Sequence, residues 1–251
     1  MMKIAGVVSI GSYTLEDLER KKQSLQTVLH PGTQLDMFAA DSGVPYIESS
    51  LEFYLSEVAV ARKVVEVAAM GYDAVVGTAF LDNGLDAARE LVDIPVVGPA
   101  KTTLYMASTL ANRFAVIMAA GDLPKHVWAF AKVLGVHDRI VAIPTLKCTV
   151  ADFLHDEDNA VAMMVSMGRQ LMEEQGAEAL VLGCGSTTGL AAQVANELDI
   201  PVLDPGLTAL KYAEMLLALG LSHSKRAYPT NPRVAQLLAD MAGTDRIRNQ
   251  T

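Results

Sequence analysis

The chain has 251 residues, of which 51% are hydrophobic, and a formal net charge of −9 at pH 7. This acidic balance argues against a nucleic-acid partner, which would require a basic surface. No apolar run approaches the ~20 residues of a membrane-spanning helix, and the first residues lack the pattern of a signal peptide. We therefore expect a cytoplasmic protein that associates with neither nucleic acid nor a membrane.

Short apolar runs alternate with longer segments of helical spacing, which is typical of a parallel sheet with helices on both faces. The predicted strands cover residues 3–9, 34–38, 74–78, 96–98, 114–119, 139–143, 179–183 and 202–204. The predicted helices cover residues 14–29, 51–70, 84–91, 102–110, 124–134, 158–174, 189–198 and 208–219. The expected fold class is α/β.

One passage of the chain occurs twice. Residues 71–99, GYDAVVGTAFLDNGLDAARELVDIPVVGP, correspond to residues 176–205, GAEALVLGCGSTTGLAAQVANELDIPVLDP, with one inserted residue before the shared Asp-Ile-Pro-Val. In this register Cys184 lies opposite Ala79. Strands of α/β proteins resemble one another in general. That general resemblance does not account for the Gly-Leu and Asp-Ile-Pro-Val elements, which both passages share at a nearly constant offset in residue number. We therefore predict an internal duplication.

The duplication predicts two pseudo-symmetric α/β halves, each with a parallel sheet. It extends back to the first strand, because Lys3-Ile4-Ala5 matches Arg113-Phe114-Ala115, and Gly11 beyond that strand matches Gly121. The first half should cover residues 1–99, completed by the C-terminal segment 206–251, and the second half residues 100–205. A cleft between two such halves is the natural place for the active site.

Cys184 is the strongest candidate for chemistry, because it directly follows a buried strand and precedes a helix. Gly183 and Gly185 allow backbone N–H groups to approach a ligand, and a helix N-terminus favours an anion such as a thiolate. Among the following hydroxyls, Ser186, Thr187 and Thr188, at least one is expected to cap the helix and another to bind a ligand carboxylate. The alternative is a buried, inert cysteine, the commoner fate of a lone cysteine, but the glycine-rich setting favours a functional one.

The loops opposite Cys184 contribute further polar candidates. Thr78 ends the corresponding strand of the first half, and Asp82 or Asn83 is expected to cap the helix that follows. Ser9 and Ser12 follow the first strand and should reach the same cleft. These residues complete the set of small polar groups expected around a ligand.

We expect neither a metal nor a cofactor. The five histidines include no pair at metal-ligand spacing, and neither a phosphate loop nor a dinucleotide fingerprint is visible. The second cysteine, Cys148, lacks a glycine setting and is expected to be a structural residue.

Four motifs carry a resemblance to a known family. They are DNGLDAARELVDIPVVG at 82–98, VLGCGSTTGLA at 181–191, SGVPYIES at 42–49 and LGLSHSKRAY at 219–228. With these motifs the chain resembles the aspartate/glutamate/hydantoin racemase superfamily, most closely its hydantoin and allantoin racemase branch. The resemblance implies two pseudo-symmetric halves, cofactor-independent catalysis, a homo-oligomer and a small substrate that is anionic or a cyclic amide.

The same resemblance implies that one cysteine from each half flanks the acidic carbon of the substrate, and Cys184 falls on the second of these. It adds Gly43, Val44, Pro45 and Phe80 to the candidate substrate-binding residues.

The first family cysteine is missing from this chain. The family pattern C-F-x-D-P-G-L is here AFLDNGL at 79–85, so that Ala79 takes the cysteine position. An engineered Cys→Ala exchange would explain Ala79 alone. It would not explain Leu81, Asn83 or the altered loop after the first strand, so we favour a natural divergence.

These observations leave three functional hypotheses. The first is a cofactor-independent isomerase in which Cys184 transfers a proton at the acidic carbon of a cyclic ureide or an amino-acid-like acid. The second, suggested by Ala79, is one-sided chemistry in the same fold, in which a single thiol acts on one face of the substrate. Examples are decarboxylation and thiolate-assisted ring opening. The third is a binding protein without catalysis.

Overall fold

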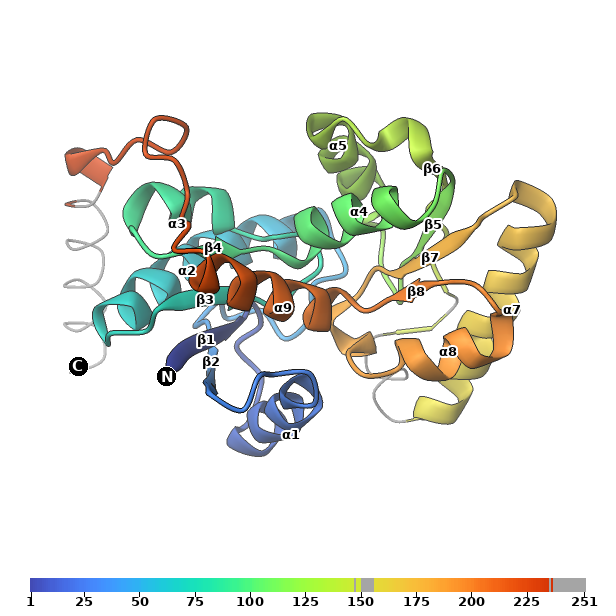
Figure 1. Cartoon of the computed structure of the whole chain (residues 1–251), viewed down its shortest axis with the longest axis horizontal. Helices are drawn as coiled ribbons and strands as arrows, with labels where there is room; N and C mark the ends of the chain where they lie inside the picture. Colours follow the sequence, from blue (N-terminus) through green and yellow to red (C-terminus); the bar gives the residue numbers. More distant parts are fainter. Residues whose placement is uncertain (147, 150–155, 235, 237–251) are drawn as a thin grey trace.

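Two four-stranded parallel sheets form the framework of the part of the chain that a computed structural model describes, residues 1–146, 148–149, 156–234 and 236. The strand order is β2-β1-β3-β4 in the first sheet and β6-β5-β7-β8 in the second (Figure 1). All of these strand pairs are parallel. The two sheets therefore repeat one topology, as a duplicated unit requires.

The strands are β1 (Met2–Val8), β2 (Thr33–Ala39), β3 (Ala74–Gly77), β4 (Val96–Val97), β5 (Phe114–Ile117), β6 (Ile140–Ala142), β7 (Ala179–Leu182) and β8 (Val202–Leu203). The helices are α1 (Leu15–Gln26), α2 (Ser50–Ala69), α3 (Leu85–Leu91), α4 (Pro99–Leu110), α5 (Pro124–Leu134), α7 (Glu157–Gln175), α8 (Ala191–Leu198) and α9 (Pro205–Ala218), with short 3₁₀ turns η1 (His137–Arg139) and η2 (Gly185–Thr187).

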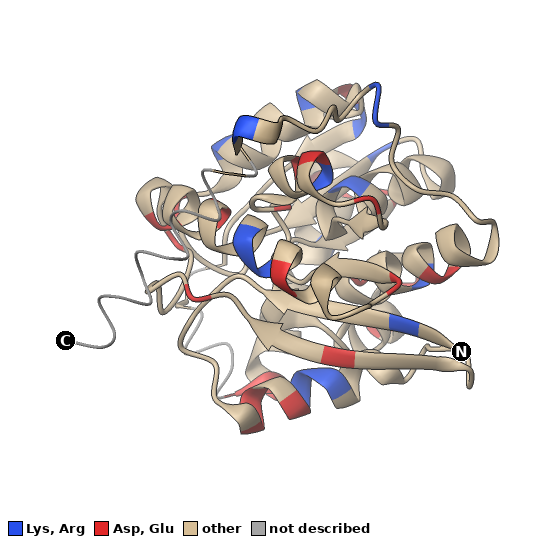
Figure 2. Ribbon diagram, turned by 90° about the vertical axis from the view of Figure 1, so that its left-hand side faces the viewer, with Lys and Arg blue, Asp and Glu red and all other residues tan. Residues whose placement is uncertain are grey.

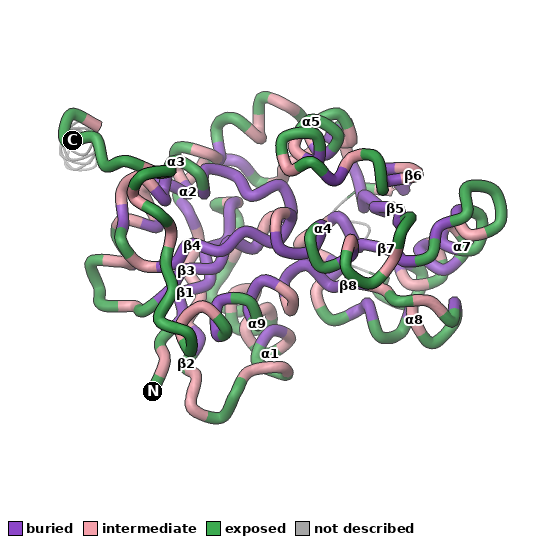
Figure 3. Tube along the Cα trace, turned by 45° about the horizontal axis from the view of Figure 1, so that its top comes forward, coloured by how far each residue is buried: buried purple, intermediate pink, exposed green. Residues whose placement is uncertain are grey.

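Each sheet is covered by helices on both faces. The first sheet lies between α2 and α3 on one face and α1 and α9 on the other. The second lies between α4 and α5 on one face and α7 and α8 on the other. Figure 3 shows the central strands as continuous buried segments. This double coverage explains why the strands are nearly continuous apolar runs rather than alternating ones.

Helices α4 and α9 cross from one half to the other. Helix α4 follows β4 of the first sheet, yet its Ala100 and Leu104 pack into the core of the second sheet. Helix α9 follows β8 of the second sheet, yet its Ala209 and Leu210 pack into the core of the first. The two helices contact each other and lie side by side at the middle of Figure 1. This exchange joins the halves through their apolar cores.

Local sequence explains where several helices begin. Ser49 and Glu52 form a capping box at the start of α2, each side chain accepting from the other residue's backbone N–H. Helices α4 and α9 begin at Pro99 and Pro205, whose fixed φ suits a first helical turn in which the missing N–H is not needed. Both helices therefore start three residues before the predicted positions.

The predicted fold class is confirmed, and each predicted strand and helix has a counterpart among the described residues. The division into residues 1–99, completed by 206–251, and 100–205 stays a prediction, and residues 237–251 lie outside the described part. Within that part, no helix is both long and apolar enough to cross a membrane. Basic and acidic residues are interspersed along the ribbon in Figure 2.

Candidate active site

A cavity lies between the two halves, just beyond the carboxyl ends of the central strands of both sheets. Ser9 follows β1, Thr78 follows β3, Ala119 lies two residues after β5, and Gly183 follows β7. Ligand crevices of parallel sheets lie at this edge. The cavity is lined by Val8, Ser9, Ile10, Tyr13, Lys21, Tyr46, Ile47, Thr78, Ala79, Phe80, Leu81, Asn83, Met118, Ala119, Ala120, Leu123, Gly183, Cys184, Gly185 and Ser186.

Cys184 and Ala79 line this cavity from corresponding loops of the two halves. The loops are in contact, because a Cβ built on Gly185 would lie 2.3 Å from the carbonyl oxygen of Thr78 and 3.8 Å from the Cα of Ala79. Only glycine allows so close an approach of two backbones. The structure therefore brings the thiol-bearing loop and the alanine-bearing loop together at one site.

The Cys184 loop is held by its own hydrogen bonds. The backbone N–H of Ser186 points at the Cys184 Sγ over 3.4 Å, and Thr187 donates its hydroxyl to the Cys184 carbonyl over 2.6 Å. The expectation that one of these hydroxyls caps the following helix is wrong. The turn η2 separates Cys184 from α8, and α8 begins after Leu190 without a side-chain cap.

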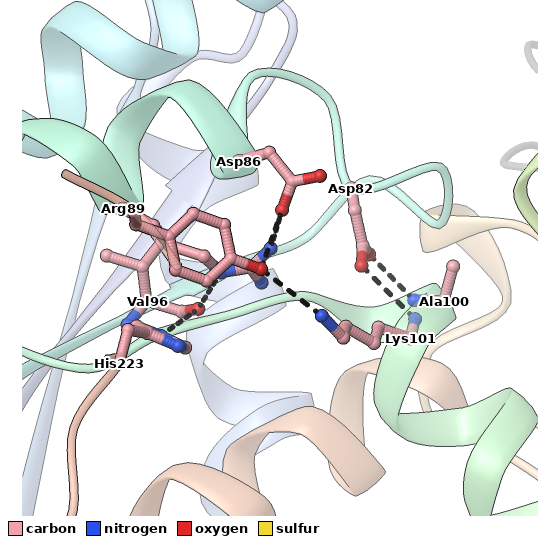
Figure 4. Close-up of polar contacts among 8 residues, drawn as sticks. Asp82, Asp86, Arg89, Val96, Ala100, Lys101 and His223 are labelled. Atoms are coloured by element: carbon pink, nitrogen blue, oxygen red, sulfur yellow. Dashed lines mark hydrogen bonds and ion pairs between the residues drawn. The ribbon is translucent and has the colours of Figure 1, made fainter. Parts of the chain in front are cut away.

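The Ala79 loop is anchored to helix α4 rather than to α3. The carboxylate of Asp82 accepts the backbone N–H groups of Ala100, at 2.8 Å, and Lys101, at 3.1 Å (Figure 4). Burial raises the pKa of Asp82 to about 7, against the opposing effects of Arg89 and of these two N–H groups. The prediction that Asp82 or Asn83 caps α3 is therefore wrong.

Asn83 instead donates to the Ser56 hydroxyl over 2.8 Å. Helix α3 begins after Gly84, which adopts φ +68° and has no side-chain cap. A Cβ at Gly84 would lie 2.1 Å from the Glu57 carbonyl oxygen, so both its conformation and its contacts require glycine.

In the segment 42–49, the residues that line the cavity are not the predicted Gly43, Val44 and Pro45 but the two residues that follow them. Val44 and Pro45 use their carbonyl oxygens to accept hydrogen bonds from the Gly11 backbone N–H, at 3.1 Å, and the Ser12 hydroxyl, at 2.9 Å. The side chains that line the cavity are those of the next two residues, Tyr46 and Ile47.

The structure brings together most of the predicted site residues. Those that line the cavity are Ser9, Thr78, Ala79, Phe80, Gly183, Cys184, Gly185 and Ser186. Those that do not line it are Ser12, Gly43, Val44, Pro45 and Thr187. Ser12 lines an adjoining groove, and Thr187 is buried.

Several lining residues were not predicted, above all Tyr13 and Lys21. Lys21 lies in α1, and its Nζ donates to the Gly185 carbonyl oxygen of the other half over 2.7 Å. Tyr13 precedes α1, and burial, with a smaller contribution from Cys184, raises its pKa to about 12. The position of Tyr13 so soon after β1 was a usable signal, whereas no sequence pattern marks Lys21.

Cys148 is half-buried and does not line the cavity, although its thiol donates to the Ala119 carbonyl oxygen over 3.3 Å. Among the described residues, no group of three or more His, Cys, Asp or Glu side chains is arranged to hold a metal ion.

The family model for Asp/Glu/hydantoin racemases matches residues 14–213. The chain belongs to this family. It is 32% identical over 221 residues to a hydantoin racemase of Paenarthrobacter aurescens, covering 88% of this chain and 94% of the relative. It is 34% identical over 193 residues to a hydantoin racemase of Pseudomonas sp. (strain NS671), covering 77% of this chain and 78% of the relative.

The fold of this racemase-family chain is also similar to that of an allantoin racemase from Klebsiella pneumoniae. The TM-score is 0.85 at 29% identity, over 92% of this chain and 94% of the other. These relatives confirm the hydantoin and allantoin branch and place the chain among enzymes of the racemase and isomerase class.

One family motif, residues 219–228, lies against α3 and β4 and contributes no lining residue to the cavity (Figure 4). The His223 Nε2 lies 2.8 Å from the Val96 nitrogen and 2.9 Å from its oxygen, on the edge strand of the first sheet. Lys225 donates to the carbonyl oxygen of Arg89 in the last turn of α3 and to that of Val92, which directly follows the helix. In this racemase-family chain the motif therefore covers this sheet edge and supplies the acceptor for the Val96 N–H.

Proposed function

We propose that this protein is a cofactor-independent enzyme in which Cys184 transfers a proton at the acidic carbon of a small substrate. The substrate is a cyclic ureide of the hydantoin type or an amino-acid-like acid. The observation that carries the proposal is the cavity between the halves, lined by Cys184 and, from the corresponding loop, by Ala79. Hydantoin and allantoin racemases among the relatives support the substrate class.

The Cys184 thiolate takes the proton from the substrate carbon, so that a C–H bond breaks and an S–H bond forms. The electron pair delocalises onto the neighbouring carbonyl oxygen as an enolate. Return of the proton from the same sulfur restores the C–H bond. A positioned acid–base group of this kind contributes on the order of 10²–10⁴ in rate.

Ala79 limits what the site does next. Racemisation in two steps without a cofactor needs a base on one face of the carbon and an acid on the other, and a methyl group supplies neither. A single thiol returns the proton to the face of the carbon from which it came, unless the substrate rotates within the cavity and presents its other face. We therefore expect rapid exchange with solvent hydrogen and slow inversion.

One-sided chemistry is the second candidate function, and Ala79 is the observation that favours it. In a decarboxylation, carbon dioxide leaves with cleavage of a C–C bond, and the single Cys184 thiol protonates the resulting carbanion. Thiolate-assisted ring opening is a further form of this candidate. The hypothesis of a binding protein without catalysis is not favoured, because the relatives are racemases, and it would require a Cys184 that reacts no faster than glutathione near pH 7.

The test is to replace each cysteine separately. Cys184→Ala should abolish turnover and deuterium exchange at the substrate carbon while leaving the fold intact, because the residue lies in a loop and only half-buried. The matched control is Cys148→Ala, which should leave turnover and deuterium exchange nearly unchanged. Retention of more than about a tenth of wild-type activity by Cys184→Ala would contradict the assigned role, since acid–base catalysis is worth far more than that.

A further inference from the structure

Asn83 has a buried side-chain oxygen, Oδ1, that accepts no hydrogen bond from the described residues. The residue is 2% exposed. It also lines the cavity between the halves, on the loop that bears Ala79. Buried amide oxygens in proteins are in general hydrogen-bonded, so an unsatisfied one in the wall of a ligand cavity indicates a donor that the ligand brings.

The neighbours of Asn83 fix which end of its amide is unpaired. Ser56, which is fully buried in α2, donates its hydroxyl proton to the Phe53 carbonyl oxygen over 2.7 Å. Because that proton is committed, the Ser56 oxygen accepts a hydrogen bond from the Asn83 Nδ2, over 2.8 Å. The Nδ2 end of the amide is therefore held against α2, and Oδ1 is the end without a partner.

The backbone on both sides of Asn83 is fixed as well. Asp82, before it, holds the loop to the start of α4 by accepting two backbone N–H groups. Gly84, after it, lies against α2, where a Cβ would be 2.1 Å from the Glu57 carbonyl oxygen. The Asn83 oxygen is therefore a preorganised acceptor, which a ligand can use without first ordering the loop.

Asn83 differs in kind from the other polar side chains of the cavity. The hydroxyl groups among the described lining residues are those of Ser9, Tyr13, Tyr46, Thr78 and Ser186. A hydroxyl can donate or accept, whereas an amide oxygen only accepts. The family pattern C-F-x-D-P-G-L has proline at position 83, and a proline side chain has no hydrogen-bonding group. The Asn83 acceptor is therefore a departure from that pattern, four residues from the Ala79 departure.

We propose that Asn83 is a specificity-determining residue, whose Oδ1 accepts a hydrogen bond from a ring N–H group of a cyclic ureide. The inference rests on the proposed function, in which the substrate occupies this cavity. A dicarboxylate that loses carbon dioxide has no N–H group and leaves the oxygen unpaired. Asn83 thus favours substrates with an N–H group and holds them to the wall of the cavity that bears Ala79.

The test measures binding by calorimetry with 5,5-dimethylhydantoin, a ring with two N–H groups and no hydrogen at the carbon that would react. Binding is therefore measured without turnover. The comparison ligands are 1,5,5-trimethylhydantoin and 3,5,5-trimethylhydantoin, each of which lacks one N–H group. One of the two should bind wild type at least about tenfold more weakly than the parent, because a site that hydrogen-bonds a donor rejects the analogue without it.

Asn83→Leu keeps the approximate size of the side chain and removes the acceptor. It should weaken the binding of 5,5-dimethylhydantoin by about three- to tenfold, and it should abolish the difference between the parent and the N-methyl ligand. A merely structural role would instead weaken the binding of all three ligands alike. The matched control is Asn112→Leu, at an exposed asparagine that does not line the cavity, which should leave the three affinities unchanged.

The same preference for the parent ligand in Asn83→Leu as in wild type would overturn the proposal. So would equal binding of the three ligands by wild type, which would assign Oδ1 to water; this comparison needs no variant and holds even if Asn83→Leu does not fold. The proposed function fails with different signatures. Wild type that binds none of the three ligands would overturn the ureide class together with this contact. Hydrogen exchange retained by Cys184→Ala would overturn the role of the thiol and leave the Asn83 contact standing.

Discussion

Replacing Asp82 with asparagine should remove a loss of stability that the wild-type protein suffers as the pH rises from about 4 to about 7. The side chain is 8% exposed and holds the Ala79 loop against the start of α4. Burial raises its pKa in the folded protein from 3.8 to about 7. Between these values the folded state keeps a proton that the unfolded chain has lost, so stability falls as the pH increases.

The size of this effect follows from the two pKa values of Asp82. The difference between 3.8 and about 7, at about 1.4 kcal/mol for each pH unit, amounts to about 4 kcal/mol. The stabilisation is fully present below about pH 4 and is lost by about pH 7. Asparagine stays neutral throughout this pH range, so the unfolding free energy of the variant should lack this decrease with pH. The variant does lose one of the two hydrogen bonds that Asp82 accepts from the start of α4.

The assay is urea unfolding of both proteins at one-unit steps from pH 4 to pH 8. Because every other titrating group is common to the two proteins, the difference in unfolding free energy isolates Asp82. We expect Asp82→Asn to gain about 4 kcal/mol relative to wild type between pH 4 and pH 7. If the unfolding free energies of the two proteins instead change in parallel with pH, the account of this carboxyl group is refuted.

Three further outcomes test the fold. Gly185→Ala should cost about 1–3 kcal/mol and lower turnover, because its Cβ would lie 2.3 Å from the Thr78 oxygen; thermal unfolding equal to wild type would contradict this contact. His223→Ala should lower the unfolding free energy by about 1–3 kcal/mol, since it leaves the Val96 backbone N–H without its acceptor; an unchanged urea midpoint would contradict that. Large side chains such as Tyr105 and Tyr212 are exposed on α4 and α9, and burial of such side chains between subunits would favour a homo-oligomer. Light scattering should therefore give a mass above that of the 26.8 kDa monomer. A monomer mass at every dilution would contradict a homo-oligomer.

The sequence alone predicted the strands, the helices and the duplicated plan, because these depend on local apolar spacing and on turns that the two halves share. It also predicted that the Ala79 and Cys184 loops lie close together, because a duplicated fold places equivalent loops, each at the carboxyl end of its strand, on facing sides of the cleft between the halves. The helix caps were predicted wrongly for a physical reason. The Asp82 carboxylate reaches the start of α4, which is distant in sequence, so local spacing could not reveal its partner.

Lys21 was missed for a similar reason. An amphipathic pattern shows which face of α1 is apolar, but the reach of one long side chain to Gly185 depends on how the two halves dock. The segment 42–49 was placed correctly in general and wrongly in detail. Its backbone at Val44 and Pro45 supports the loop, whereas Tyr46 and Ile47 line the cavity.

The central claim is that Cys184 acts alone, and that residue 79 is the position of the missing second acid–base group. Chiral chromatography with deuterium incorporation, applied to a 5-substituted hydantoin, tests it in wild type and in Ala79→Cys. Wild type should exchange the hydrogen at the substrate carbon and keep a single configuration, while Ala79→Cys should scramble configuration because both faces then have a thiol. If wild type already racemises the substrate as fast as the variant, residue 79 is not the missing position and the account fails.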